Sequence, residues 1–194
     1  MQSDKNFVRR QIAAERKAYT ELFRSCENEA ICHHILLSDQ YRSAKTILCY
    51  VSFGAEVDTH KLIRAMIADG KTVCVPQVTD KRGIMRAVRL DSWLQLAEGT
   101  YGILEVADEA PTVIDSTKLD LILVPAVAFT LSGERLGMGG GFYDRYLSQS
   151  QAQTMGLAFL CQIKEEIPTD EWDRKMDFIV TKNGITDCRA ERRI

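Results

Sequence analysis

The chain has 194 residues, 45% of them hydrophobic, so it is long enough to bury the core of one domain over residues 1–194. Its 25 basic and 27 acidic side chains give a formal net charge of −2, which favours neither nucleic acid nor an anionic membrane surface as a partner. No apolar run reaches membrane-spanning length, and the charged first residues lead into no apolar segment. We therefore expect a cytoplasmic protein that contacts neither nucleic acid nor membrane.

The first third of the chain changes from helical to strand periodicity. Apolar residues recur at helical spacing from residue 4 to about 37, which predicts one or two amphipathic helices, with Asp4 or Ser3 as the cap. The run "TILCYV" (46–51) is short and apolar throughout, as in a strand that is covered on both faces. A further helix is then predicted, with Asp58 or Thr59 as its cap and Gly70 at its end.

Strands and helices alternate over the rest of the chain. We predict strands at 71–77, 84–90, 119–125, 154–160 and 177–181, and a helix from about 141 to 149. Cys49 and Cys74 fall inside predicted strands, and the six cysteines have no C-x-x-C spacing, so we expect reduced structural thiols. The alternation predicts a single three-layer α/β domain, with a mostly parallel central sheet flanked by helices and an N-terminal helical segment.

The segment "RLGMGGGFYDRYL" (135–147) has glycine at four of the five positions 137–141, between a predicted strand and a predicted helix. Glycines there leave backbone N–H groups open to an anion, and the guanidinium of Arg135 suits a phosphate. The spacing matches neither the Walker A loop nor the dinucleotide-binding fingerprint. The pattern therefore leaves two interpretations open, an anion-binding loop or a purely structural tight turn.

The longer stretch "VPAVAFTLSGERLGMGGGFYDRYL" (124–147) closely resembles the signature of the 5-formyltetrahydrofolate cyclo-ligase family, which contains R-L-G-x-G-x-G-[YF]-Y-D. Shorter segments extend the resemblance from about residue 5 to residue 181. They are "KNFVR" (5–9), "YVSFGAEVDT" (50–59), "YGILE" (101–105) and "IPTDEWDRKMD" (167–177). The sequence departs from the common family pattern at Met138, Gly140 and Trp172.

The resemblance implies an enzyme that uses ATP and Mg²⁺ to convert 5-formyltetrahydrofolate into 5,10-methenyltetrahydrofolate, with release of ADP and phosphate. It assigns catalytic roles to Arg135 and Lys5, and metal binding to Asp144 and Asp173. The residues that it assigns to ATP are Lys5, Arg9, Arg135, Leu136, Gly137, Met138, Gly139, Gly140, Gly141, Phe142 and Tyr143. Those that it assigns to the folate substrate are Val51, Phe53, Glu56, Tyr101, Met138, Gly139, Gly140, Gly141 and Phe142.

Several alternatives stay open from the sequence. The loop could bind phosphate without ATP, as in a sugar-phosphate isomerase or an acyl-CoA transferase on a similar α/β scaffold, or the domain could bind a nucleotide without catalysis. Asp144 could pair with Arg135 or Arg145 instead of binding a metal, and we expect Asp177 to be structural. We expect a monomer whose partners are its small-molecule substrates, 5-formyltetrahydrofolate and ATP.

Overall fold

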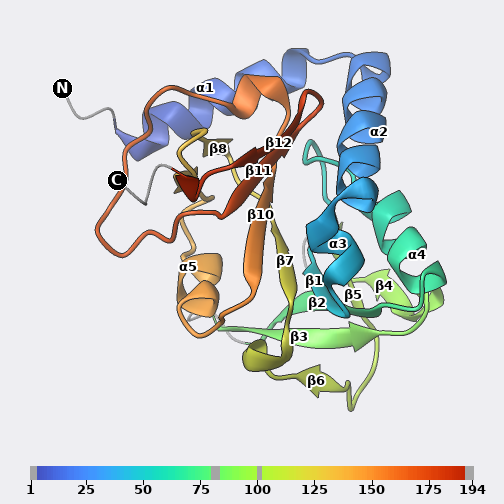
Figure 1. The fold of residues 1–194 in the computed structure, drawn as a ribbon. Coiled ribbons are helices and arrows are strands. Elements are labelled where there is room, and N and C mark those ends of the chain that lie inside the picture. The colour runs from blue at the N-terminus through green and yellow to red at the C-terminus, as the bar shows by residue number, and fades with distance from the viewer. Residues whose placement is uncertain (1–3, 80–83, 100–101, 191–194) are drawn as a thin grey trace.

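The computed structural model describes residues 4–79, 84–99 and 102–190 (Figure 1). An eight-stranded sheet has the strand order β12-β11-β10-β7-β1-β2-β3-β6. Its middle strands, from β11 to β2, are all parallel, and β12, β3 and β6 are antiparallel to their neighbours at the two edges. In chain order the strands of this sheet are β1 (Thr46–Cys49), β2 (Thr72–Val78), β3 (Met85–Leu90), β6 (Val113–Ile114), β7 (Leu121–Val124), β10 (Gln153–Leu157), β11 (Phe178–Thr181) and β12 (Gly184–Asp187).

Helices cover both faces of the sheet. The helices α2 (Glu21–Leu37), α3 (Asp39–Ser43) and α4 (His60–Ala68) lie on one side, and α5 (Phe142–Leu147) lies on the other (Figure 1). The middle strands β1 and β7 are apolar almost throughout, because helices cover both faces of the sheet and successive side chains of a strand point to opposite faces. Ile47 and Cys49 therefore belong to the core under α2 and α4, whereas Leu48 belongs to the core under α5.

The helix α1 (Lys5–Ala18) crosses one end of the sheet and contacts β8 (Ala128–Phe129) and the short 3₁₀ helix η4 (Leu160–Gln162) (Figure 1). Asp4 caps α1 as predicted, since its Oδ1 accepts a hydrogen bond of 2.9 Å from the N–H of Asn6. Residue 3, the other predicted cap, lies outside the described residues. The N-terminal segment thus forms two long helices, with a break at Tyr19 and Thr20.

The other predicted elements agree with the structure within a few residues, with one exception, whereas α3 and the edge strands β6 and β12 were not predicted. The strand predicted at 154–160 ends at Leu157, because the chain turns there into η4 beneath α1. At the predicted helix after β1, Thr59 is the N-cap but makes no side-chain capping bond, while Asp58 accepts a bond of 2.9 Å from the N–H of His60. Gly70, with φ +73°, follows the end of that helix as predicted.

Two small hairpins were not predicted. One pairs β4 (Leu96–Glu98) with β5 (Leu104–Val106), and the other pairs β8 with β9 (Arg135–Leu136). The glycine segment consequently follows the β8–β9 hairpin and not the central strand β7. None of the described helices is both long and apolar enough to cross a membrane.

Candidate functional site

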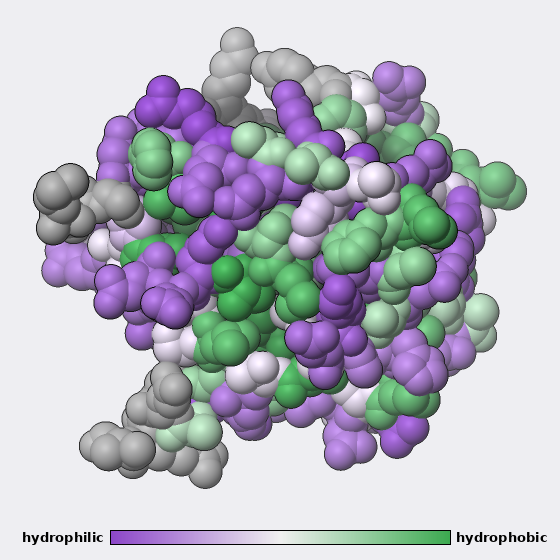
Figure 2. Space-filling model, turned by 90° about the horizontal axis from the view of Figure 1, so that it is seen from above, coloured by the Kyte–Doolittle hydropathy of each residue, from purple (hydrophilic) through white to green (hydrophobic). Residues whose placement is uncertain are grey.

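A cleft of about 910 Å³ opens beside the carboxyl ends of β2 and β7, where open α/β sheets commonly bind ligands. Seen from the side of α1, apolar side chains gather in the middle of the molecule and hydrophilic ones surround them (Figure 2). The residues that line the cleft are Lys5, Arg9, Glu56, Pro76, Val78, Met85, Ile103, Glu105, Pro125, Ala126, Arg135, Leu136, Gly137, Met138, Gly139, Gly140, Gly141, Phe142, Tyr143, Asp144, Arg145, Ser148, Asp170, Trp172 and Asp173.

The glycine segment forms one wall of the cleft, close to α1. The Nε of Arg9 donates a hydrogen bond of 2.9 Å to the carbonyl oxygen of Gly137. Gly139 has φ +104° and Gly141 has φ +65°, a backbone region that other residues seldom adopt. A Cβ on Gly139 would also lie 3.4 Å from a terminal nitrogen of Arg9. Glycine is therefore required here by conformation, and it leaves the backbone of this wall uncovered.

Arg135 and Asp144 form an ion pair at the inner part of the cleft. The side chain of Arg135 is only 4% exposed, and one of its terminal nitrogens donates to Oδ1 of Asp144. The Nε of Arg135 is buried and has no hydrogen-bond partner among the described residues. The alternative in which Asp144 pairs with Arg135 is thus the arrangement present in this structure.

A second ion cluster lies next to it, where Lys5 from α1 meets the segment 170–173. The Nζ of Lys5 lies 2.6 Å from Oδ2 of Asp170 and 2.9 Å from Oδ2 of Asp173. Burial alone would raise the pKa of Asp173, but the hydrogen bonds from Lys5 and the N–H of Asp170, with the charges of Lys5 and Arg135, hold it below its ordinary value. Asp173 therefore remains ionised at neutral pH.

The two carboxylates predicted to bind a metal thus line the same cleft, and each is held by a cation. Among the described residues no group of three or more His, Cys, Asp or Glu side chains could hold a metal ion. Mg²⁺ usually takes only one or two protein carboxylates and completes its shell with water and phosphate oxygens. Asp144 and Asp173 fit that donor set when a nucleotide supplies the phosphates.

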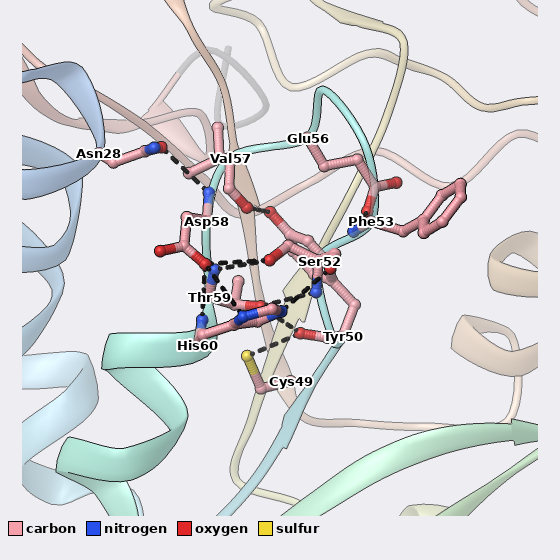
Figure 3. A network of polar contacts seen from close by, with 10 residues as sticks. All are labelled: Asn28, Cys49, Tyr50, Ser52, Phe53, Glu56, Val57, Asp58, Thr59 and His60. Atoms are coloured by element: carbon pink, nitrogen blue, oxygen red, sulfur yellow. Dashed lines mark hydrogen bonds and ion pairs between the residues drawn. The ribbon is translucent and has the colours of Figure 1, made fainter. Parts of the chain in front are cut away.

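Glu56 lies on the loop between β1 and α4, at another part of the cleft wall (Figure 3). Its Oε2 accepts a hydrogen bond of 3.0 Å from the N–H of Phe53. Burial raises the pKa of Glu56, although this hydrogen bond and the charge of Arg16 act against the rise. The loop is fixed at its ends, since the Tyr50 hydroxyl donates to the carbonyl of Val57 over 2.9 Å.

Two of the predicted substrate residues that the structure describes do not line the cleft. Val51 is buried, and Phe53 is half exposed, but neither lines the cleft. Tyr101 lies outside the described residues.

Asp177, expected to be structural, accepts hydrogen bonds from the backbone N–H and the hydroxyl of Thr154, over 2.9 and 3.0 Å, and so joins β10 to the start of β11.

The sequence prediction missed the other residues of the cleft. The strand residues Pro76, Val78 and Met85 form part of its wall, and their pattern does not distinguish them from ordinary core residues. Asp170 and Trp172 were given no role from the sequence, although both lie in the segment "IPTDEWDRKMD" that resembles the family.

The fold and the cleft together define an α/β protein with a cleft at the carboxyl ends of parallel strands, lined by cations and open glycine backbone. The model of the 5-formyltetrahydrofolate cyclo-ligase family matches residues 1–182. The chain therefore belongs to the 5-formyltetrahydrofolate cyclo-ligase family.

Individual relatives agree with this assignment. The 5-formyltetrahydrofolate cyclo-ligase of Haemophilus influenzae is 33% identical over 170 residues, which cover 86% of this chain and 91% of the relative. That of Mus musculus is 29% identical over 193 residues, which cover 94% of this chain and 95% of the relative. The NMR structure of 5,10-methenyltetrahydrofolate synthetase from Aquifex aeolicus has a TM-score of 0.84 and 28% identity, and covers 95% of this chain and 93% of that one.

Proposed function

We propose that this cleft binds 5-formyltetrahydrofolate together with ATP and closes the folate ring to 5,10-methenyltetrahydrofolate. The chain is an ATP-dependent cyclo-ligase by family, and ADP and phosphate are the other products. The observation that carries the proposal is that one cavity holds both a cationic, glycine-rich wall and the partly buried carboxylate of Glu56. The isomerase and transferase alternatives need no ATP, and family membership disfavours them.

The reaction needs ATP because a formamide carbon is a poor electrophile. In the proposed sequence the formyl oxygen attacks the γ-phosphorus, an O–P bond forms, and ADP leaves. N10 then adds to the activated formyl carbon, the C–O bond breaks with release of phosphate, and N10 loses its proton. The protein has to align the formyl oxygen with the γ-phosphorus, stabilise the charge of the phosphates and exclude water that would hydrolyse ATP.

The glycine segment and the nearby cations suit the phosphates. Gly139 and Gly141 present backbone without a Cβ, and Arg9 already contacts this segment through Gly137. The guanidinium of Arg135 is fixed by Asp144 and can stabilise charge on the transferred phosphoryl group, and Lys5 can do the same from α1.

Glu56 suits the pterin end of the folate. A carboxylate can accept hydrogen bonds from both the ring N–H and the 2-amino group of a pterin, which lie side by side on one edge. Such bonds to an ionised, mostly buried acceptor are stronger than neutral ones. Glu56 would thereby orient the pterin so that its formyl group faces the phosphate wall.

Asp144 and Asp173 would hold Mg²⁺ with the ATP phosphates. The metal supplies positive charge that neutralises the phosphate oxygens and orients them. Because both carboxylates are paired with cations in this structure, we expect Arg135 and Lys5 to shift part of their contact to the phosphates when the nucleotide binds. Each carboxylate would thus have a cation beside it in both states: Arg135 or Lys5 before the nucleotide binds, and Mg²⁺ afterwards.

The experiment is a direct assay of turnover. The purified chain is incubated with 5-formyltetrahydrofolate, with and without Mg-ATP, and the near-ultraviolet absorbance of the methenyl product is followed. We expect product only when both Mg²⁺ and ATP are present, and much less from an Arg135→Met variant that is still folded. Product formation without ATP, or none with it, would contradict the proposal.

A further inference from the structure

Trp172 is an exposed aromatic residue on the wall of the cleft. It is 67% exposed and lines the cleft together with Asp170 and Asp173. Among the described residues, no other ring stacks on the Trp172 ring and no cation lies over it. A large apolar ring left in water next to a ligand cleft points to a contact made with the ligand.

The backbone on both sides of Trp172 is held in place. Asp170 and Asp173 share the ammonium group of Lys5, and the N–H of Asp170 donates to Oδ2 of Asp173 over 2.8 Å. On the other side the N–H of Arg174 lies 3.5 Å from Oδ1 of Asp144, the partner of Arg135. The ring is therefore presented from a fixed segment beside the cations that we assign to phosphate.

The proposed function indicates which part of ATP would meet Trp172. In the proposed function the pterin lies at Glu56, and the γ-phosphate must meet the formyl group next to it. The rest of the phosphate chain then runs away from Glu56, past Arg135 and Lys5. The part of ATP that follows the phosphates is the ribose with its purine base, and Trp172 lies in the chain between Asp170 and Asp173, the two residues that hold Lys5.

We propose that Trp172 stacks on the purine base of ATP and is a specificity-determining residue of the nucleotide site. This inference rests on the proposed function for the direction in which ATP lies. Stacking of a base on an aromatic side chain contributes enough to change affinity by about tenfold to a hundredfold. The contact distinguishes a nucleotide from free polyphosphate, which the cationic wall alone does not.

The chain offers a matched control, because Trp93 is its only other tryptophan. Trp93 does not line the cleft, and its ring is covered by Arg64, whose guanidinium carbon lies 4.1 Å from the ring centroid. A Trp93→Phe variant therefore has Trp172 as its sole tryptophan, and its fluorescence reports on that position. We expect ADP to quench this emission and inorganic tripolyphosphate to leave it unchanged, although tripolyphosphate competes with ATP.

The second measurement uses Trp172→Ala in the otherwise unchanged chain. We expect the Kd for ADP and the KM for ATP to rise about tenfold to a hundredfold, while the inhibition constant of tripolyphosphate and the KM for 5-formyltetrahydrofolate change less than about twofold. Trp172→Phe should recover most of the ADP affinity, because the stacking surface is retained. Trp93→Phe should bind ADP like the unaltered chain.

An unchanged Trp172 emission at saturating ADP would overturn the inference, and so would equal losses of ADP and tripolyphosphate affinity in Trp172→Ala. A selective rise in the KM for folate would place the ring against the other substrate and overturn it as well. These results are distinct from failure of the proposed function. If the unaltered chain forms no methenyl product while ADP still quenches Trp172, the proposed reaction fails and the base contact stands.

Discussion

Replacing Glu56 by glutamine tests the folate end of the site with little change in shape. In this structure one oxygen of the Glu56 carboxylate accepts the N–H of Phe53 over 3.0 Å. An amide has a single acceptor oxygen, so it can keep this bond or face the pterin edge, and its NH₂ group would meet pterin donors. Glu56→Gln should therefore lose folate binding much more than ATP binding.

The expected size follows from the bonds that are lost. Hydrogen bonds to a charged group contribute about 1.5–3 kcal/mol each, so losing one to two of them at the pterin edge costs about 3 kcal/mol. This corresponds to a fall of roughly a hundredfold in kcat/KM for 5-formyltetrahydrofolate. The KM for ATP should change by less than about twofold, because among the described residues Glu56 forms no ion pair with Lys5, Arg9 or Arg135.

The pH dependence gives a second readout. Burial raises the pKa of Glu56, so in the free protein this carboxyl becomes protonated at a higher pH than an ordinary glutamate. Since the pterin needs the ionised form, the KM for folate should rise as the pH falls through this raised pKa. Glu56→Gln should lose that limb of the profile.

A Glu29→Gln variant is the matched control, because Glu29 is exposed and does not line the cleft. It should keep kcat/KM for folate within about twofold of the unaltered chain. Equal losses for folate and ATP in Glu56→Gln, or an unchanged pH profile, would refute the assignment of Glu56 to the pterin.

Two further predictions concern the phosphate wall and the metal. Gly139→Ala and Gly70→Ala both place a side chain at positive φ and should each cost about 1–2 kcal/mol of stability. Only Gly139→Ala should raise the KM for ATP. Gly70 follows α4, with no atom within 4 Å of its Cβ position, and serves as the control for the backbone conformation alone. Thermal unfolding and ATP titration measure the two effects, and equal ATP kinetics in both variants would count against a close approach of ligand to this wall. Asp144→Asn and Asp173→Asn should each raise the Mg²⁺ concentration for half-maximal rate and leave metal-free folate binding nearly unchanged. If both variants reach half-maximal rate at the same Mg²⁺ concentration as the unaltered chain, neither carboxylate is a ligand.

The sequence pattern predicted the six inner strands of the sheet, because they carry a strong local signal, but not the edge strands β6 and β12. The runs around Leu48 and Ile122 are apolar on both faces, which happens only when helices cover a sheet from both sides. The β8–β9 hairpin escaped prediction because each of its strands has only two residues. Consequently the glycine segment could be recognised, but its connection to the central sheet could not.

The site itself was only partly predictable, because its ion pairs join residues far apart in the chain. Lys5 pairs with Asp173 across 168 positions, and no local pattern indicates which carboxylate a lysine will meet. Trp172 lies in a segment without regular structure, so periodicity could not place it at the cleft. The resemblance to the family grouped Arg135, Asp144, Lys5 and Asp173 in one site, and the structure shows that these residues line one cleft and are paired there. It also included Val51 and Phe53, which do not line the cleft.

The most direct test of the mechanism follows the formyl oxygen. 5-Formyltetrahydrofolate carrying ¹⁸O in its formyl group is converted by the chain with Mg-ATP, and the released phosphate is examined by mass spectrometry. If the formyl oxygen attacks the γ-phosphorus, each molecule of methenyl product is accompanied by one phosphate that contains the label. Unlabelled phosphate, with methenyl product formed at the normal rate, would contradict phosphorylation of the formyl oxygen as the step that ATP drives.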